Sequence, residues 1–160
     1  MNEHSFIYRG AGPMAAVANL REIARRTAIG MPVDGPLQTW LAACLEQFLQ
    51  RRAPSIEAAF GLRAPRGGVP WWLEEAIRQR DDALRELAAR FLAGQSVTAQ
   101  ARRIHCEAVR YAASAWRHDR AAGTLPERHR GRLQESLWRA FRSGAPMPIC
   151  ERQLRSILAR

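Results

Sequence analysis

The sequence predicts an all-α protein: a compact bundle of about six helices joined by short turns that contain glycine or proline. Three observations carry this prediction. Apolar residues recur at spacings of three and four along most of the chain. No stretch shows the strict alternation of a β-strand, and Gly and Pro fall between the periodic segments. A chain of 160 residues with 47% hydrophobic content is large enough to bury a core as one helical domain, which we place at 14–160.

The N-terminal third contains the first three predicted elements. Residues 1–13 are expected to be flexible, because glycines and Pro13 interrupt any pattern there. A first helix begins at Met14 and ends at Gly30, where glycine favours termination. A second helix over 37–52, stopped by Pro54, carries a broad apolar stripe that requires burial. Ser55 is a natural N-cap for a short third helix.

The segment 63–70, RAPRGGVP, is the clearest linker in the chain, with two prolines and two glycines. Such a composition fits a hinge between an N-terminal and a C-terminal helical half. The segment is also short enough to be a tight connection within one domain. Both interpretations stay open from the sequence.

Four further helices are predicted after this linker. One covers 71–93 and stops at Gly94. The next covers 96–120, which contains no Pro or Gly, with Ser96 or Thr98 as its N-cap. Thr124 and Glu127 have the spacing of a capping box and predict another helix. Its inward residues are Leu133, Leu137, Trp138 and Phe141, and Gly131 costs it about 1 kcal/mol. A closing helix directs Ile149, Leu154, Ile157 and Leu158 inward.

Three segments share one pattern, beginning at Leu20, Leu84 and Leu133. Each has a leucine, a glycine ten or eleven residues later, and apolar residues three and ten positions beyond that glycine. The pattern indicates helix, glycine turn and helix three times over, as in repeated hairpins or helix-turn-helix units. Helical periodicity alone also generates such matches, and we favour that explanation.

The charge is strongly positive and unevenly distributed. The chain has 25 Lys and Arg, all of them arginine, and a formal net charge of +10. A GC-rich genome explains the choice of arginine over lysine, but not the excess of cations. Residues 101–160 contain thirteen arginines against five acids, so most of the field belongs to the last third of the chain. A localised positive field indicates a polyanionic partner.

The predicted helix 96–120 presents Arg103, Arg110 and Arg117 at intervals of seven, which places them along one line of an α-helix. Arginine suits phosphate contacts through its planar, permanently charged fork. Glu107 lies within pairing reach of two of these arginines, so the row also fits a solvated helix face. The residues that we expect to contact nucleic acid are Arg102, Arg103, Arg110, Arg117, Arg120, Arg128, Arg130 and Arg132.

Catalysis and cofactor binding are not expected. The sequence contains no phosphate-binding loop, no GxSxG or HExxH motif and no dinucleotide-binding glycine pattern. The chain has three cysteines, Cys44, Cys106 and Cys150, which are far apart in the sequence. An odd number of distant cysteines fits reduced thiols, and their spacing from the histidines is not that of a zinc site. No apolar run is long enough to cross a membrane, and the N-terminus lacks the pattern of a signal peptide. We therefore expect a cytoplasmic protein without a membrane partner.

These features favour a small nucleic-acid-binding protein, with DNA as the expected polymer and arginine–phosphate contacts from the C-terminal half as the mechanism. A bacterial or phage regulatory or accessory protein would fit. The alternative is a helical module that docks an acidic or apolar protein surface without any nucleic-acid role. The exposure of Trp71 and Trp72 distinguishes these two functions. If both are buried they belong to the core, whereas an exposed one indicates a protein interface.

Overall fold

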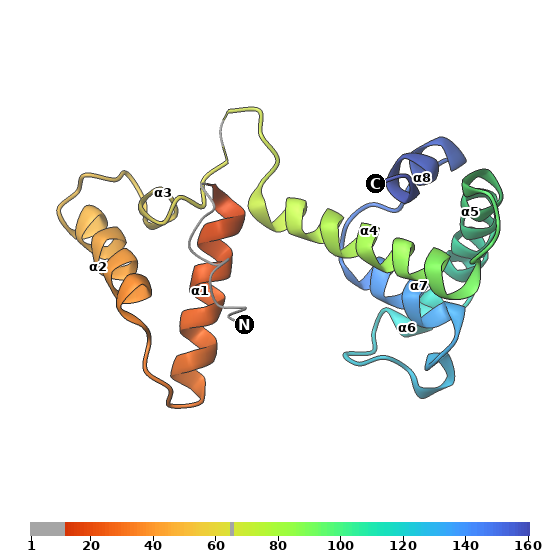
Figure 1. Ribbon diagram of the computed structural model, residues 1–160, viewed down its shortest axis with the longest axis horizontal. Coiled ribbons are helices and arrows are strands. Elements are labelled where there is room, and N and C mark those ends of the chain that lie inside the picture. The colour runs from red at the N-terminus through yellow and green to blue at the C-terminus, as the bar shows by residue number, and fades with distance from the viewer. Residues whose placement is uncertain (1–11, 65) are drawn as a thin grey trace. The chain divides into compact units, whose positions relative to one another are not determined.

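The structure, a computed structural model, describes residues 12–64 and 66–160 (Figure 1). Within this part of the chain all regular elements are helical and no strand occurs, which confirms the all-α prediction. Eight α-helices are present in these residues, and two of them, α3 and α6, have only four residues. The six longer helices agree with the predicted number.

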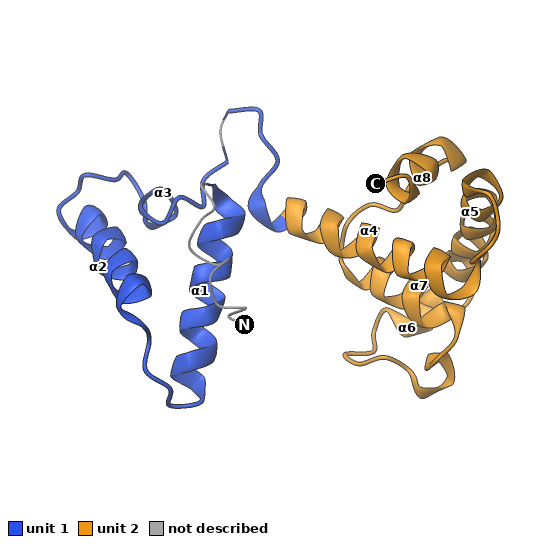
Figure 2. Cartoon of the chain, in the orientation of Figure 1, with its two compact units in different colours: residues 1–72 blue, residues 73–160 orange. Residues whose placement is uncertain are grey.

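The chain divides into two units, residues 1–72 and 73–160 (Figure 2). The division falls just after the predicted linker 63–70. That this linker is a hinge stays a prediction. Among the described residues, no helix is sufficiently long and apolar to cross a membrane.

The first unit contains α1 (Pro13–Ala28), α2 (Gly35–Leu49) and α3 (Ile56–Ala59). Ser55 caps α3, as predicted, by accepting a hydrogen bond from the backbone of Ala58. The flexible segment expected at 1–13 lies outside the described residues except at its end. There the expectation was wrong, because Pro13 is the first residue of α1. Proline fits this position because the N–H groups of the first helical turn have no hydrogen-bond acceptor within the helix.

The core of the first unit is small. Cys44 of α2 is buried with Ala59 and Phe60, and the Trp40 ring meets the Phe60 ring edge to face at 5.5 Å between centroids. Leu49 at the end of α2 remains 75% exposed. The apolar stripe predicted for this helix is therefore only partly buried within the described residues.

The second unit begins within α4. Helix α5 contacts α6, α7 and, most extensively, α8. The elements are α4 (Trp71–Phe91), α5 (Val97–Ala113), α6 (Trp116–Asp119), the 3₁₀ helix η2 (Glu127–His129), α7 (Leu133–Arg142) and α8 (Glu151–Leu158).

Leucine and isoleucine side chains fill the core of this unit. Those that are almost completely buried come from four helices: Leu84, Leu87, Ile104, Leu137 and Leu154. Burial of each such side chain stabilises the fold by roughly 1.5–3 kcal/mol. The prediction that Ile149 points inward was wrong, because this residue precedes α8 and is 82% exposed.

The predicted single helix over 96–120 was wrong. Helix α5 begins after the N-cap Ser96, as expected, but ends at Ala113, and Ser114 leaves the helical conformation with φ −118° and ψ −95°. The chain turns there because Trp116 packs on the Tyr111 and Phe141 rings, with centroids 6.2 and 5.3 Å away. We infer that the ring contacts and partial burial of the indole outweigh continuation of the helix.

The predicted start of the next helix, at the Thr124–Glu127 capping box, was also wrong. Residues Glu127–His129 form only a 3₁₀ turn, and α7 begins at Leu133. Gly131 lies between them with φ +69°, a left-handed conformation that glycine adopts freely and that no helix continues. Its N–H donates to Glu135 Oε2 at 2.7 Å, so this acid, rather than Glu127, supports the helix start.

The three predicted helix–glycine–helix junctions all occur. Gly30 lies between α1 and α2, Gly94 between α4 and α5, and Gly144 between α7 and α8. All three have a positive φ, between 67° and 83°, so each is a helix terminator in the left-handed region. A common origin of the three segments stays a prediction.

Candidate nucleic-acid interface

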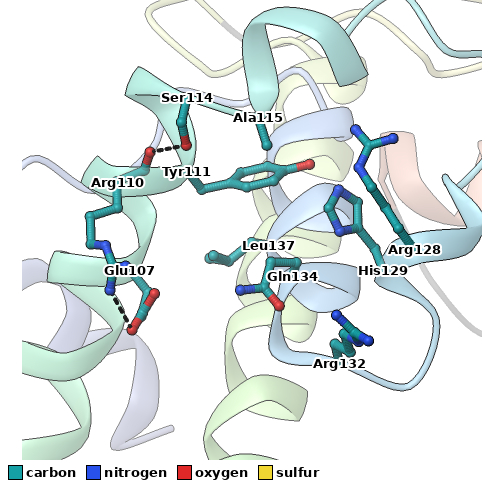
Figure 3. Close-up of a pocket in the computed structure, with 10 residues that line it drawn as sticks. All are labelled: Glu107, Arg110, Tyr111, Ser114, Ala115, Arg128, His129, Arg132, Gln134 and Leu137. Atoms are coloured by element: carbon teal, nitrogen blue, oxygen red, sulfur yellow. Dashed lines mark hydrogen bonds and ion pairs between the residues drawn. The ribbon is translucent and has the colours of Figure 1, made fainter.

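A cavity of about 330 Å³ lies in the second unit, between the C-terminal half of α5 and the segment that leads into α7 (Figure 3). Three of the predicted contact residues line it: Arg110, Arg128 and Arg132. They come from α5, from η2 and from the N-cap of α7. The fold therefore brings together arginines that are up to 22 positions apart in the sequence.

These three arginines are exposed at the cavity, with different degrees of charge compensation. Arg110 is 76% exposed and lies 3.5 Å from Glu107, which also lines the cavity. Arg128 forms an ion pair with Asp119 and keeps 58% of its side chain exposed. The Arg132 side chain has no acidic partner within the described residues. Each guanidinium has five N–H donors, so all three retain donors for an anion.

The carboxylate of Asp119 lies behind this surface and organises it. Asp119 is 2% exposed, and it accepts hydrogen bonds from the Tyr111 hydroxyl at 2.8 Å and from His129 Nε2 at 2.7 Å. The Arg128 guanidinium donates to its other oxygen. A buried carboxylate that accepts three such bonds fixes all of its donors in one geometry.

The same contacts shift two pKa values in opposite directions. Burial raises the pKa of Asp119, but the hydrogen bonds from His129 and Tyr111 and the charge of Arg128 outweigh burial and hold it below its usual range. Burial, with the hydrogen bond to Asp119, raises the pKa of the Tyr111 hydroxyl far above its ordinary value. Asp119 is therefore anionic and Tyr111 neutral near pH 7.

One of the two ring nitrogens of His129 makes no hydrogen bond within the described residues. Because an ionised carboxylate only accepts hydrogen bonds, His129 Nε2 carries the hydrogen that Asp119 accepts. The second nitrogen, Nδ1, has no hydrogen-bond partner within the described residues, although His129 is only 6% exposed and lines the cavity. When the ring is neutral, Nδ1 is an acceptor that a bound molecule can use.

The arginine row predicted on a single helix is interrupted. Arg103 and Arg110 both lie on α5 and share Glu107, at 2.8 and 3.5 Å. Arg117 lies on α6, beyond the turn at Ser114, so it does not continue their line. All three arginines are exposed as expected.

The other predicted arginines lie outside the cavity lining. Arg102 is 3.8 Å from Glu151, and Arg130 is 3.1 Å from Glu127. Arg120 is exposed beside α6, and its carbonyl accepts a bond from Arg142 at 3.5 Å. Within the described residues, the side chains of Arg117 and Arg120 carry no ion pair.

Sequence reasoning missed Asp119 and His129, the buried pair behind Arg128. Neither residue was among the expected contact residues. One signal was present: between Arg117 and Arg132, Asp119 and Glu127 are the only acids among five arginines. An acid isolated in a basic segment is a candidate for a buried ion pair.

The cysteines lie apart from this cavity. Cys44 is buried, Cys106 and Cys150 are exposed, and all three are free thiols. In the part of the chain that the structure describes, no group of three or more His, Cys, Asp or Glu side chains is arranged to hold a metal ion.

Comparisons with known proteins add no indication of function, so the function proposed below is inferred from the cavity and its residues. No family model, no curated protein and no solved structure matches this chain.

Proposed function

We propose that the chain binds nucleic acid, DNA in the first instance, by contacts between the cavity arginines and backbone phosphates. The observation that carries the proposal is that three elements each place an arginine around one cavity: Arg110, Arg128 and Arg132. Planar guanidinium groups match phosphate oxygens in geometry and charge. The role is one of binding rather than catalysis.

The surroundings of the cavity favour an anionic ligand. Glu107 is the only acid among the described residues that line it. Two exposed cations lie next to it along the chain, Arg117 on α6 and Arg120 directly after α6. Asp119 compensates part of the charge of Arg128, but it also fixes the orientation of that guanidinium. A preoriented donor loses less conformational entropy when a ligand binds.

The test is fluorescence anisotropy with labelled DNA at about 150 mM salt. The variant Arg110→Gln/Arg132→Gln removes two cavity cations and leaves the Arg128–Asp119 pair in place. The matched control, Arg63→Gln/Arg66→Gln, removes the same charge from exposed linker residues outside the cavity. Each lost phosphate contact is expected to weaken binding at least tenfold, at roughly 1.5–3 kcal/mol per hydrogen bond to a charged group.

Wild-type binding in the low micromolar range that is lost in the cavity variant and kept in the control supports the proposal. Equal weakening in both variants contradicts it, because the positive charge would then act through its total amount alone. Circular dichroism of each variant establishes that the helical fold is retained.

A second candidate function has one observation in its favour. Trp72 is 59% exposed and Val69 is 49% exposed, and exposed tryptophan is typical of protein interfaces. A partner with an apolar surface would bind here with little dependence on salt, whereas phosphate binding weakens steeply as salt is added. Trp72→Ala would then abolish partner binding and leave DNA binding unchanged.

A further inference from the structure

The cavity has a recessed floor below its arginine rim. Arg110, Arg128 and Arg132 are exposed, whereas Tyr111 is 4% exposed and Leu137 is 1% exposed, although both line the same cavity. Figure 3 shows the Tyr111 ring, the His129 ring and Leu137 around the middle of the cavity, with Arg110 and Arg128 on opposite sides. A ligand that only touched the rim would leave this floor uncovered.

The size of the cavity also exceeds what a phosphate group fills. A volume of about 330 Å³ lies at the lower end of the range that small-molecule sites occupy, roughly 300–1,000 Å³. A phosphate held by the arginines would therefore leave room for the group attached to it. That group faces an aromatic ring and the aliphatic side chains of Leu137 and Ala115.

Two polar groups in the cavity have unused hydrogen-bonding capacity that a phosphate diester cannot satisfy alone. His129 Nδ1 is an acceptor when the ring is neutral, and His129 lines the cavity, whereas an ionised diester has no hydrogen to donate. The Gln134 side chain, which lines the cavity, offers one acceptor and two donor hydrogens and makes no hydrogen bond within the described residues. Nucleobase edges and sugar hydroxyls carry the donors and acceptors that complement such groups.

We propose that the cavity binds one unpaired nucleotide of a single strand, with the two phosphates that flank it on the arginine rim and the sugar and base in the recess. This inference rests on the proposed function and names the form of nucleic acid. In a duplex the bases pair inside the helix, so only the backbone reaches a surface cavity. In a single strand the base is free to turn into it and pack on the floor.

The first test compares binding of one labelled strand of about 15 nucleotides with binding of its blunt duplex, using the full chain. Single-stranded DNA is expected to bind about tenfold more tightly than the duplex, since the floor adds contacts for the strand alone. The variant Gln134→Leu removes the amide at similar size and should reduce single-strand affinity several-fold without changing duplex affinity. Gln95→Leu, at an exposed position between α4 and α5, is the matched control.

A second test uses the wild-type chain, so it does not depend on how a variant folds. Adenosine 5′-monophosphate and inorganic phosphate compete with the labelled strand, and the nucleotide is expected to displace it at about tenfold lower concentration. Equal displacement by both, with equal affinity for strand and duplex, overturns the single-nucleotide inference and leaves nucleic-acid binding intact. If neither strand nor duplex binds at about 150 mM salt, the proposed function itself fails.

Discussion

Asp119 Oδ2 and His129 Nε2 lie 2.7 Å apart, ten positions apart in the sequence, with both side chains buried. This contact joins α6 to η2 and closes the loop between them. Because the Arg128 guanidinium donates to the same carboxylate, the contact that closes the loop also positions a cation at the cavity. Stability of the second unit and geometry of the cavity therefore depend on one acidic side chain.

Replacement of that carboxylate is expected to be strongly destabilising. Asp119→Ala leaves the Tyr111 hydroxyl and His129 Nε2 buried without their acceptor, and removal of one partner from a buried charged network costs about 3–5 kcal/mol. Chemical denaturation followed by circular dichroism measures the change. The control Glu127→Ala breaks the exposed pair with Arg130 and should cost at most about 1 kcal/mol. Similar losses in both variants would show that Asp119 contributes no more than a surface acid.

The same carboxylate predicts how stability depends on acidity. The pKa of Asp119 is lowered in the folded chain, against about 3.9 for an unperturbed aspartate in an unfolded chain. Its contribution to stability is therefore present above about pH 4 and is lost as the pH falls further, through the lowered folded pKa. Denaturation midpoints between about pH 2 and 6 should fall less steeply in Asp119→Asn than in wild type. If the denaturation midpoints of both proteins fell equally steeply as the pH is lowered, the proposed contribution of Asp119 would be contradicted.

The conformation of Gly131 predicts a substitution effect of opposite sign to the one that the sequence suggests. Within a helix, Gly→Ala would stabilise the chain by about 1 kcal/mol. At φ +69°, the same change is expected to destabilise it by roughly 1–2 kcal/mol, because a Cβ is disfavoured in the left-handed region. No atom lies within 4 Å of the added Cβ, so the cost comes from the backbone alone.

Gly123 provides the matched control for this experiment. It belongs to the same loop and lacks a positive φ, and a Cβ there also meets nothing within 4 Å. Gly123→Ala is therefore expected to be neutral or to stabilise the chain by about 0.4–1 kcal/mol. Stabilisation by Gly131→Ala in the same denaturation assay would mean that α7 extends further toward its N-terminus than the structure has it.

The features that sequence reasoning predicted are those that depend on neighbours along the chain. Helical periodicity and the Ser55 and Ser96 caps are local, and both caps form as expected. The break at Ser114 depends on the contact of Trp116 with Phe141, which a distant helix supplies. No residue near Ser114 forbids a helix, so a local pattern has no means of detecting the turn.

The candidate site was predictable only in part for the same reason. Exposure of the arginines follows from their charge, and it was confirmed. Which arginines share a cavity depends on the loop between α6 and α7, whose path is set by the buried contacts of Asp119 with Tyr111 and His129. Those contacts join residues eight and ten positions apart on three different elements, α5, α6 and η2, and sequence spacing does not predict how separate elements are oriented.

The number of phosphates bound at the cavity can be counted from salt dependence. Each neutralised phosphate contributes about 0.7 to the slope of log affinity against log salt for a single strand. The variant Arg110→Gln/Arg132→Gln should therefore reduce the slope by about 1.4 on a single strand, through loss of two contacts. Arg63→Gln/Arg66→Gln changes the net charge equally but removes no contact, so its slope should equal that of wild type. Anisotropy titrations at several salt concentrations measure all three slopes. An unchanged slope in the cavity variant, with lower affinity, would show that these arginines stabilise the cavity without touching phosphate.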